Sequence, residues 1–155
     1  MRSLNILDLR KKSDCGGRAA QGALGICYLY GHEVEVDYKE AFRLLSLAGT
    51  SRAVVNLARM HAEGLGVPKD LPEAIRLYKA VAKYEFRAQL ELGRIYSRGM
   101  GVQADSDEAL KWYSAAATRG DDDYVDDAVT AAFVGSGTLE EIQEARAYVA
   151  KTARS

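Results

Sequence analysis

Residues 88–120 read AQLELGRIYSRGMGVQADSDEALKWYSAAATRG, and this stretch decides the fold. Both of its halves carry apolar residues at helical spacing, and two glycines separate them. Related versions precede and follow it: when Gly99 is aligned with Gly64, Gly31 and Gly135, the offsets are 35, 33 and 36 residues. Periods of this length are typical of stacked helical hairpins. The sequence therefore predicts an all-α fold, an α/α superhelix of about four helix-turn-helix repeats.

The apolar stripe of the first helix recurs in the same register in each copy. In residues 88–120 it consists of Ala88, Leu92, Ile95 and Tyr96, at positions i, i+4, i+7 and i+8. The second copy has Ala53, Leu57, Met60 and His61, and the first has Ala20, Leu24, Cys27 and Tyr28. The fourth copy is weaker, with Tyr124, Ala128, Ala131 and Ala132. On this stripe Cys27 is expected to be a small core residue.

The turn and the start of the second helix have signatures of their own. The aligned glycines stand where the first helix should end, because glycine readily adopts the left-handed conformation found there. A second glycine follows two residues later at Gly101, Gly66 and Gly137, whereas the first copy has Glu33. The spacing of a reciprocal capping box then opens the second helix, in Asp105 with Glu108, Asp70 with Glu73, and Asp37 with Glu40.

One pattern, LG-x-x-Y-x-x-G-x-GV-x-x-D followed by A-x-x-WY-x-x-AA, carries a resemblance to a known family. Its residues are Leu92, Gly93, Tyr96, Gly99, Gly101, Val102, Asp105, Ala109, Trp112, Tyr113, Ala116 and Ala117. It resembles the Sel-one-like repeat (SLR) family, relatives of the tetratricopeptide repeats, over roughly residues 18–153. The second copy departs from it at Ala58 and His61, which replace the Gly and the Tyr. The resemblance implies an α/α superhelix that serves in protein–protein adaptation.

The chain is expected to form a single repeat domain over residues 1–155. Repeats are predicted at about 18–51, 52–85, 86–120 and 121–155. Residues 1–17 are the least repetitive part, and they predict a short amphipathic helix that caps the open edge of the first repeat. An arm that docks a partner is the alternative for this segment.

Charge and cysteine content exclude several classes of partner. Lys and Arg number 21 and Asp and Glu 22, so neither nucleic acid nor a membrane surface is expected to be bound. Asn5 and Asp8 interrupt the apolar residues near the start, which argues against a signal-peptide core. Cys15 and Cys27 do not make a disulfide framework, and the expected location is a reducing cytoplasm.

No residue set predicts catalysis, a metal site or a cofactor. His32 and His61 lack the i, i+4 spacing that places two metal ligands on one helix face. The glycine pairs recur with the repeat and lack the Lys-Ser/Thr ending of a phosphate loop, so they are interpreted as turns. Trp112 aligns with Leu77, which favours core packing over a stacking platform.

Two sets of residues are not needed to form the repeat, and they are the candidates for partner binding. The first lies off the apolar stripe of the first helices: Asn56, Arg59, Glu63, Glu91, Arg94 and Arg98. Because first helices line the concave surface of tetratricopeptide-like arrays, the resemblance implies that these side chains reach a ligand. A solvated helix face is the alternative.

The second set is acidic, and it consists of Asp121, Asp122, Asp123, Asp126 and Asp127. These carboxylates repel one another, although a helix N-terminus would partly stabilise them. A calcium loop is disfavoured because the regular spacing, the central Gly and the closing Glu are missing.

The function expected from these patterns is a non-enzymatic protein–protein interaction module. It would bind a partner protein on its concave face, which is favoured, or through the acidic patch. Inhibition of a bacterial toxin, as an immunity protein, is one specific role, and an adaptor or regulator in a signalling or secretion complex is another. The alternative from a different class is a penicillin-binding or β-lactamase-like enzyme, as in cysteine-rich relatives of the family.

Overall fold

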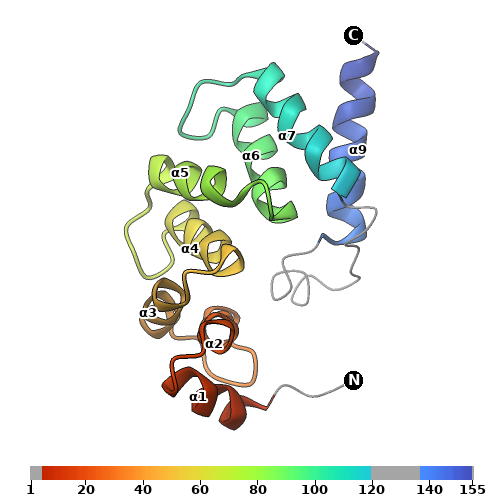
Figure 1. Ribbon diagram of the computed structural model, residues 1–155. Coiled ribbons are helices and arrows are strands. Elements are labelled where there is room, and N and C mark those ends of the chain that lie inside the picture. Colours follow the sequence, from red (N-terminus) through yellow and green to blue (C-terminus); the bar gives the residue numbers. More distant parts are fainter. Residues whose placement is uncertain (1–4, 120–136, 155) are drawn as a thin grey trace.

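The computed structural model describes residues 5–119 and 137–154, which form eight helices and no strand (Figure 1). The helices are α1 (Ile6–Asp14), α2 (Arg18–Tyr30), α3 (Tyr38–Ala48), α4 (Ser51–Glu63), α5 (Leu71–Val81), α6 (Phe86–Arg98), α7 (Ser106–Arg119) and α9 (Leu139–Ala153). The predicted break near Gly135, the first half of the fourth repeat and the acidic patch lie outside the described residues.

The helices pair into hairpins that stack along a curved array. The pairs α2–α3, α4–α5 and α6–α7 each pack together, and α3 and α5 contact the first helix of the next hairpin. In Figure 1 the second helices α3 and α5 follow the outer, left-hand side of the arc, and the first helices lie inside it. Helix α1 packs against α2 at one end, and α9 packs against α7 and α6 at the other. The predicted all-α superhelix with an N-terminal capping helix is confirmed.

The first helix of each hairpin ends at the expected glycine. Gly31, Gly64 and Gly99 all adopt left-handed φ angles of 67° to 69°. Their backbone N–H groups donate to the carbonyls of Cys27, Met60 and Ile95, which closes each helix. The glycine periodicity of the sequence therefore located three helix ends.

The capping box prediction is half wrong for the second helices. The side chains of Asp37, Asp70 and Asp105 accept from the backbone N–H three residues later, as expected. The return bond is absent, because the cap N–H groups donate instead to the carbonyls of Tyr28, His61 and Tyr96 in the preceding helix. The carboxylates of Glu40 and Glu73 are then left to pair with Arg43 and Arg76. A complete reciprocal box does open α9, between Thr138 and Glu141.

The core is a strip of three connected clusters. Each cluster joins the two helices of one hairpin to the next first helix or, at the end, to α9. Cys27 on α2 is fully buried, and burial raises the pKa of its thiol to about 11. His61 is half-buried, with its ring edge-on to Phe42, and Trp112 packs against the core. The core roles predicted for these side chains are confirmed.

The second glycine of the turn has a reason that the sequence did not reveal. A Cβ on Gly66 would lie 2.5 Å from the Cβ of Tyr38, and one on Gly101 would lie 2.7 Å from the Cβ of Leu71. Both neighbours open the second helix of the preceding hairpin. The first hairpin has no such predecessor, and Glu33 occupies its turn with φ 58°.

Replacing Glu33 with Gly is expected to raise the free energy of unfolding by about 1 kcal/mol, because a left-handed φ strains any residue with a Cβ. Glu35→Gly makes the same chemical change at a residue with ordinary φ, and we expect it to lower stability slightly. Urea unfolding of both variants measures the difference. Equal effects would show that the strain at Glu33 is negligible.

Candidate protein-binding groove

A hollow of about 340 Å³ lies on the inner side of the array, between α4, α6 and α9. We call it the inner groove. Among the described residues, its lining is rich in charged side chains and consists of Arg59, Ala62, Glu63, Tyr78, Arg87, Glu91, Arg94, Arg98, Met100 and Glu141. Five of the six first-helix candidates therefore gather at one place, and the sixth, Asn56, does not line it.

Asn56 is buried, with only 2% of its surface exposed. Its side-chain amide donates to the carbonyl of Arg52, and its Oδ1 accepts from the hydroxyl of Tyr30 at 3.1 Å. Its place off the apolar stripe suggested a surface position, but α2 contacts α4 and Tyr30 of α2 bonds to the Asn56 side chain. Asn56 thus affects the groove only indirectly: it bonds to Tyr30, which in turn binds Arg59.

Arg59 is held in place from two sides. One of its terminal nitrogens donates to the Tyr30 hydroxyl at 2.6 Å, and its Nε donates to Glu63 at 3.2 Å. The guanidinium also lies 5.2 Å from the centre of the Tyr30 ring, within the range of a cation–π contact. Arg59 thus reaches the groove with a fixed orientation.

Arg94 occupies the register of Arg59 one repeat later, and it has different partners. Its Nε lies 3.0 Å from Glu144 Oε1, and one terminal nitrogen lies 2.7 Å from Glu91. The hydrogen bond from Arg94 lowers the pKa of the Glu144 carboxyl, which also accepts from the Tyr113 hydroxyl at 3.4 Å. Arg94 therefore fastens α9 to α6, in addition to lining the groove.

Arg87 on α6 and Glu141 on α9 form a second ion pair between these two helices, and no pattern in the sequence indicated it. The two terminal nitrogens of Arg87 donate to the two carboxylate oxygens of Glu141 at 2.6 and 3.1 Å. Only 10% and 15% of these side chains are exposed. Burial raises the pKa of Glu141, but the bonds from Arg87 outweigh it and leave the pKa below its usual range. No local spacing links Glu141 to Arg87, which lies 54 residues earlier in the chain.

Arg98 is the least constrained arginine of the groove. Its side chain is 61% exposed, and its nearest carboxylate oxygen, on Glu144, lies 3.7 Å away. Glu144 is already committed to Arg94. Arg98 and the exposed Met100 therefore form a rim that an incoming chain meets first.

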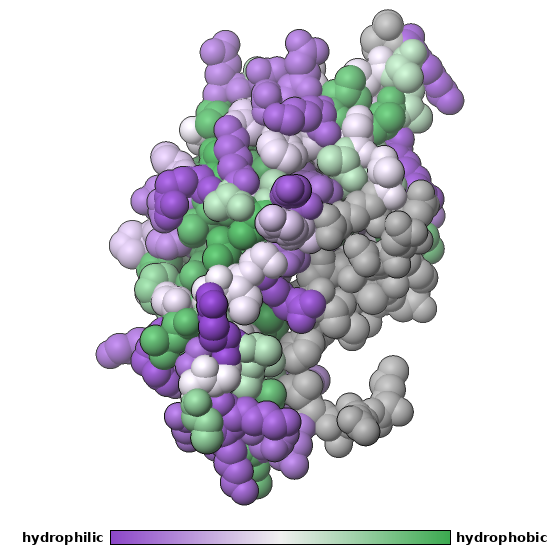
Figure 2. Space-filling model, in the orientation of Figure 1, coloured by the Kyte–Doolittle hydropathy of each residue, from purple (hydrophilic) through white to green (hydrophobic). Residues whose placement is uncertain are grey.

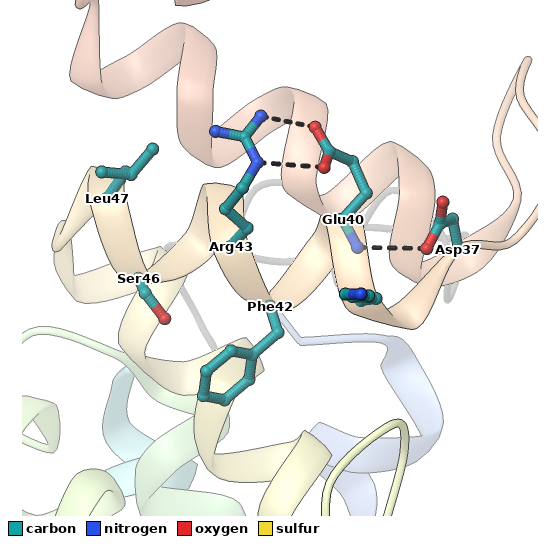
Figure 3. Close-up of a pocket in the computed structure, with 7 residues that line it drawn as sticks. Asp37, Glu40, Phe42, Arg43, Ser46 and Leu47 are labelled. Atoms are coloured by element: carbon teal, nitrogen blue, oxygen red, sulfur yellow. Dashed lines mark hydrogen bonds and ion pairs between the residues drawn. The ribbon is translucent and has the colours of Figure 1, made fainter.

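A second hollow, of about 600 Å³, lies along the outer side of α3 (Figure 3). Every described residue that lines it belongs to α3 or is its cap, Asp37, so the described part of the chain forms a wall on one side only. The Glu40–Arg43 ion pair crosses its surface, and Leu47 is exposed beside it. On the face seen in Figure 2, hydrophobic surface gathers over the middle of the array between mainly hydrophilic ends. The inner groove, with walls from several helices, is the better enclosed site.

Two further observations limit the chemistry of the described residues. Within residues 5–119 and 137–154, no three His, Cys, Asp or Glu side chains are placed to hold a metal ion together. None of the helices in those two segments has both the length and the apolar character needed to cross a membrane.

Comparisons with known proteins agree with this architecture. Three Sel1 repeats are matched, at residues 18–50, 51–83 and 86–121. A mouse protein, sel-1 homolog 2, is 35% identical over 72 residues, which are 44% of this chain but 10% of that protein. The chain therefore spans about a tenth of that relative's length.

Two solved structures are also similar. A Sel1 repeat protein from Oxalobacter formigenes superposes with a TM-score of 0.62 and 37% identity, over 76% of this chain and 91% of that one. A protective antigen of uropathogenic Escherichia coli with an SLR fold gives a TM-score of 0.70 and 29% identity, over 97% of this chain and 34% of that one. Repeat matches, register and fold lead to one conclusion: the chain belongs to the Sel1 repeat family, whose members generally mediate protein–protein interactions on a typically non-enzymatic scaffold.

Proposed function

We propose that this protein is a non-enzymatic binding module that holds a segment of a partner protein in the inner groove. The observation that carries the proposal is the fixed orientation of the groove's charged side chains. Arg59 is held by Tyr30 and Glu63, and Arg94 is held by Glu91 and Glu144. A surface whose side chains are already ordered loses little conformational entropy on binding, which favours affinity.

The rim of the groove supports the same proposal. Exposed Arg98 and Met100 combine a mobile charge with a flexible apolar side chain, and such residues are enriched where proteins bind one another. We place this binding in the cytoplasm, since Cys15 and Cys27 are both free thiols and one of them is exposed.

Inhibition of a bacterial toxin and service as an adaptor are two uses of the same groove. An inhibitor is expected to abolish an activity of its partner at an equimolar ratio, whereas an adaptor leaves that activity intact and adds a third protein. Measuring the partner's activity with increasing amounts of this protein separates the two roles.

Site-specific cross-linking tests the proposal. A photoreactive amino acid is introduced at Glu63 or Met100 in the groove and, as the control, at Lys39 or Leu47 on the outer side of α3. In cells of the source organism, we expect protein cross-links from the groove positions and few from the controls. Cross-links from the controls alone, or equal yields from both sets, would reject the inner groove as the binding surface.

A further inference from the structure

Two hydrogen-bond donors at the inner groove have no acceptor among the described residues. One is Nε of Arg87, which is buried and unpaired although the terminal nitrogens of the same side chain bind Glu141. The other is the hydroxyl of Tyr78, which lines the groove and makes no hydrogen bond within residues 5–119 and 137–154. Only 2% of Tyr78 is exposed. Buried polar groups are almost always paired, so the unpaired Nε of Arg87 points to a missing acceptor, and Tyr78 supplies a second donor at the same hollow.

The third repeat contains an acceptor of this kind. Tyr113 and Arg94 stand one repeat after Tyr78 and Arg59, in the same registers. Both contact one carboxylate, that of Glu144 on α9, which lies 3.4 Å from the Tyr113 hydroxyl and 3.0 Å from Arg94 Nε. The repeated Tyr–Arg pair therefore receives a carboxylate from within the chain in the third repeat.

The second repeat has the same pair without that carboxylate. Arg59 binds Glu63 through Nε and Tyr30 through one terminal nitrogen, and its other terminal nitrogen makes no hydrogen bond with another described residue. Glu63 accepts from Arg59 through one carboxylate oxygen, and among the described residues it makes no hydrogen bond with Tyr78. Among the described residues, no carboxylate binds both Arg59 and Tyr78 as Glu144 binds Arg94 and Tyr113.

The charge of the groove suits an anionic group. Among the described residues, four arginines and three glutamates line it, which leaves one excess positive charge in that set. Burial raises the pKa of Tyr78, so its hydroxyl stays protonated at neutral pH and acts as a donor. Arg59, Arg98 and Tyr78 all line this groove and carry hydrogen-bond donors, and a carboxylate accepts several donors at once.

We propose that the groove takes an acidic segment of the partner, one carboxylate of which binds Tyr78 and Arg59 as Glu144 binds Tyr113 and Arg94. This inference rests on the function proposed above, because it names the chemistry of the segment that the inner groove holds. Tyr78 acts in it as a specificity-determining residue. Its ring belongs to the core, and its hydroxyl selects the ligand.

Short acetylated peptides of alternating Glu and Ala are the probe, and the matching Gln–Ala peptides are the neutral control. Binding is followed by NMR, through the side-chain Nε–H signals of the arginines. We expect the Glu peptide to shift the signals of Arg59, Arg87 and Arg98, and to leave those of Arg43 and Arg76 on the outer side unchanged. The Gln peptide should cause no comparable shift.

Tyr78→Phe removes the hydroxyl and keeps the ring. It should weaken the Glu peptide at least about tenfold, the usual loss for a hydrogen bond to a charged group. Tyr113→Phe is the matched control, because that tyrosine is equally buried but does not line the groove, and its binding should match the unaltered protein. Thermal unfolding of Tyr78→Phe should be unchanged, since no hydrogen bond among the described residues is lost.

Each other outcome is decisive. Equal binding of the Glu and Gln peptides, equal shifts on the outer side, or an unaffected Tyr78→Phe would overturn the carboxylate proposal. Failure of the Glu peptide to bind would do the same. If cross-links still arise at Glu63 and Met100, the groove remains the binding surface and only the acidic character of the partner is rejected.

Discussion

Replacing Arg87 with Met lowers the free energy of unfolding by about 3 kcal/mol or more, because it leaves the buried carboxylate of Glu141 without its cation. The side chain of Met fills similar space, so the loss reports charge and not a cavity. Since repeat arrays unfold partly in local units, α9 should lose protection first. Urea unfolding gives the free energy, and hydrogen exchange of α9 amides locates the change.

Two further variants isolate the ion pair. Adding Glu141→Gln to Arg87→Met removes the unpaired charge while Gln still serves the capping box with Thr138, and most of the lost stability should return. Arg76→Met breaks the exposed pair with Glu73 and should cost less than about 1 kcal/mol. A loss for Arg87→Met no larger than that for Arg76→Met would show that this ion pair does not hold α9.

Replacing Gly101 with Ala should lower the free energy of unfolding by about 2 to 4 kcal/mol. Two effects add: φ is 71°, which strains any residue with a Cβ, and the new Cβ would lie 2.7 Å from the Cβ of Leu71. The second effect is a contact between adjacent hairpins, so the variant should loosen the stacking of the second hairpin on the third. Thermal and urea unfolding measure the loss.

Gly16→Ala is the matched control for this variant. Gly16 has φ 84°, but a Cβ there would meet no heavy atom within 4 Å. It should therefore show the backbone strain alone, about 1 kcal/mol. If Gly101→Ala lowers the free energy of unfolding no more than Gly16→Ala does, the close approach to Leu71 contributes nothing measurable to stability.

The two ion pairs that hold α9 also determine which variants are suitable for studying the groove. Arg94 binds Glu144 on α9 through two of its nitrogens, so reversing its charge would release α9 as well as alter the groove. A loss of partner binding in such a variant would not separate recognition from folding. Arg98 is mostly exposed and Tyr78 makes no hydrogen bond with any described residue, so variants at these positions report on binding more directly.

The local features of the fold were determined by the sequence alone. The period of the glycines located the ends of α2, α4 and α6, because only a residue without Cβ adopts the left-handed cap without strain. The apolar stripes identified the core, and Asp37 and Asp70 identified helix starts. These are interactions between residues a few positions apart, so they appear as periodic patterns in the sequence.

Only the tertiary structure decided which polar side chains meet. Arg87 and Glu141 are 54 residues apart, and Arg94 and Glu144 are 50 apart. Their pairing depends on how α9 lies against α6, which no spacing within one helix specifies. The same holds for Asn56, which is buried, and for Tyr78, an apolar-stripe residue that lines the groove. Helix propensity and capping depend on residues close together in the sequence. The curvature that brings successive first helices together results from many packing contacts between repeats, so the sequence of a single repeat does not specify it.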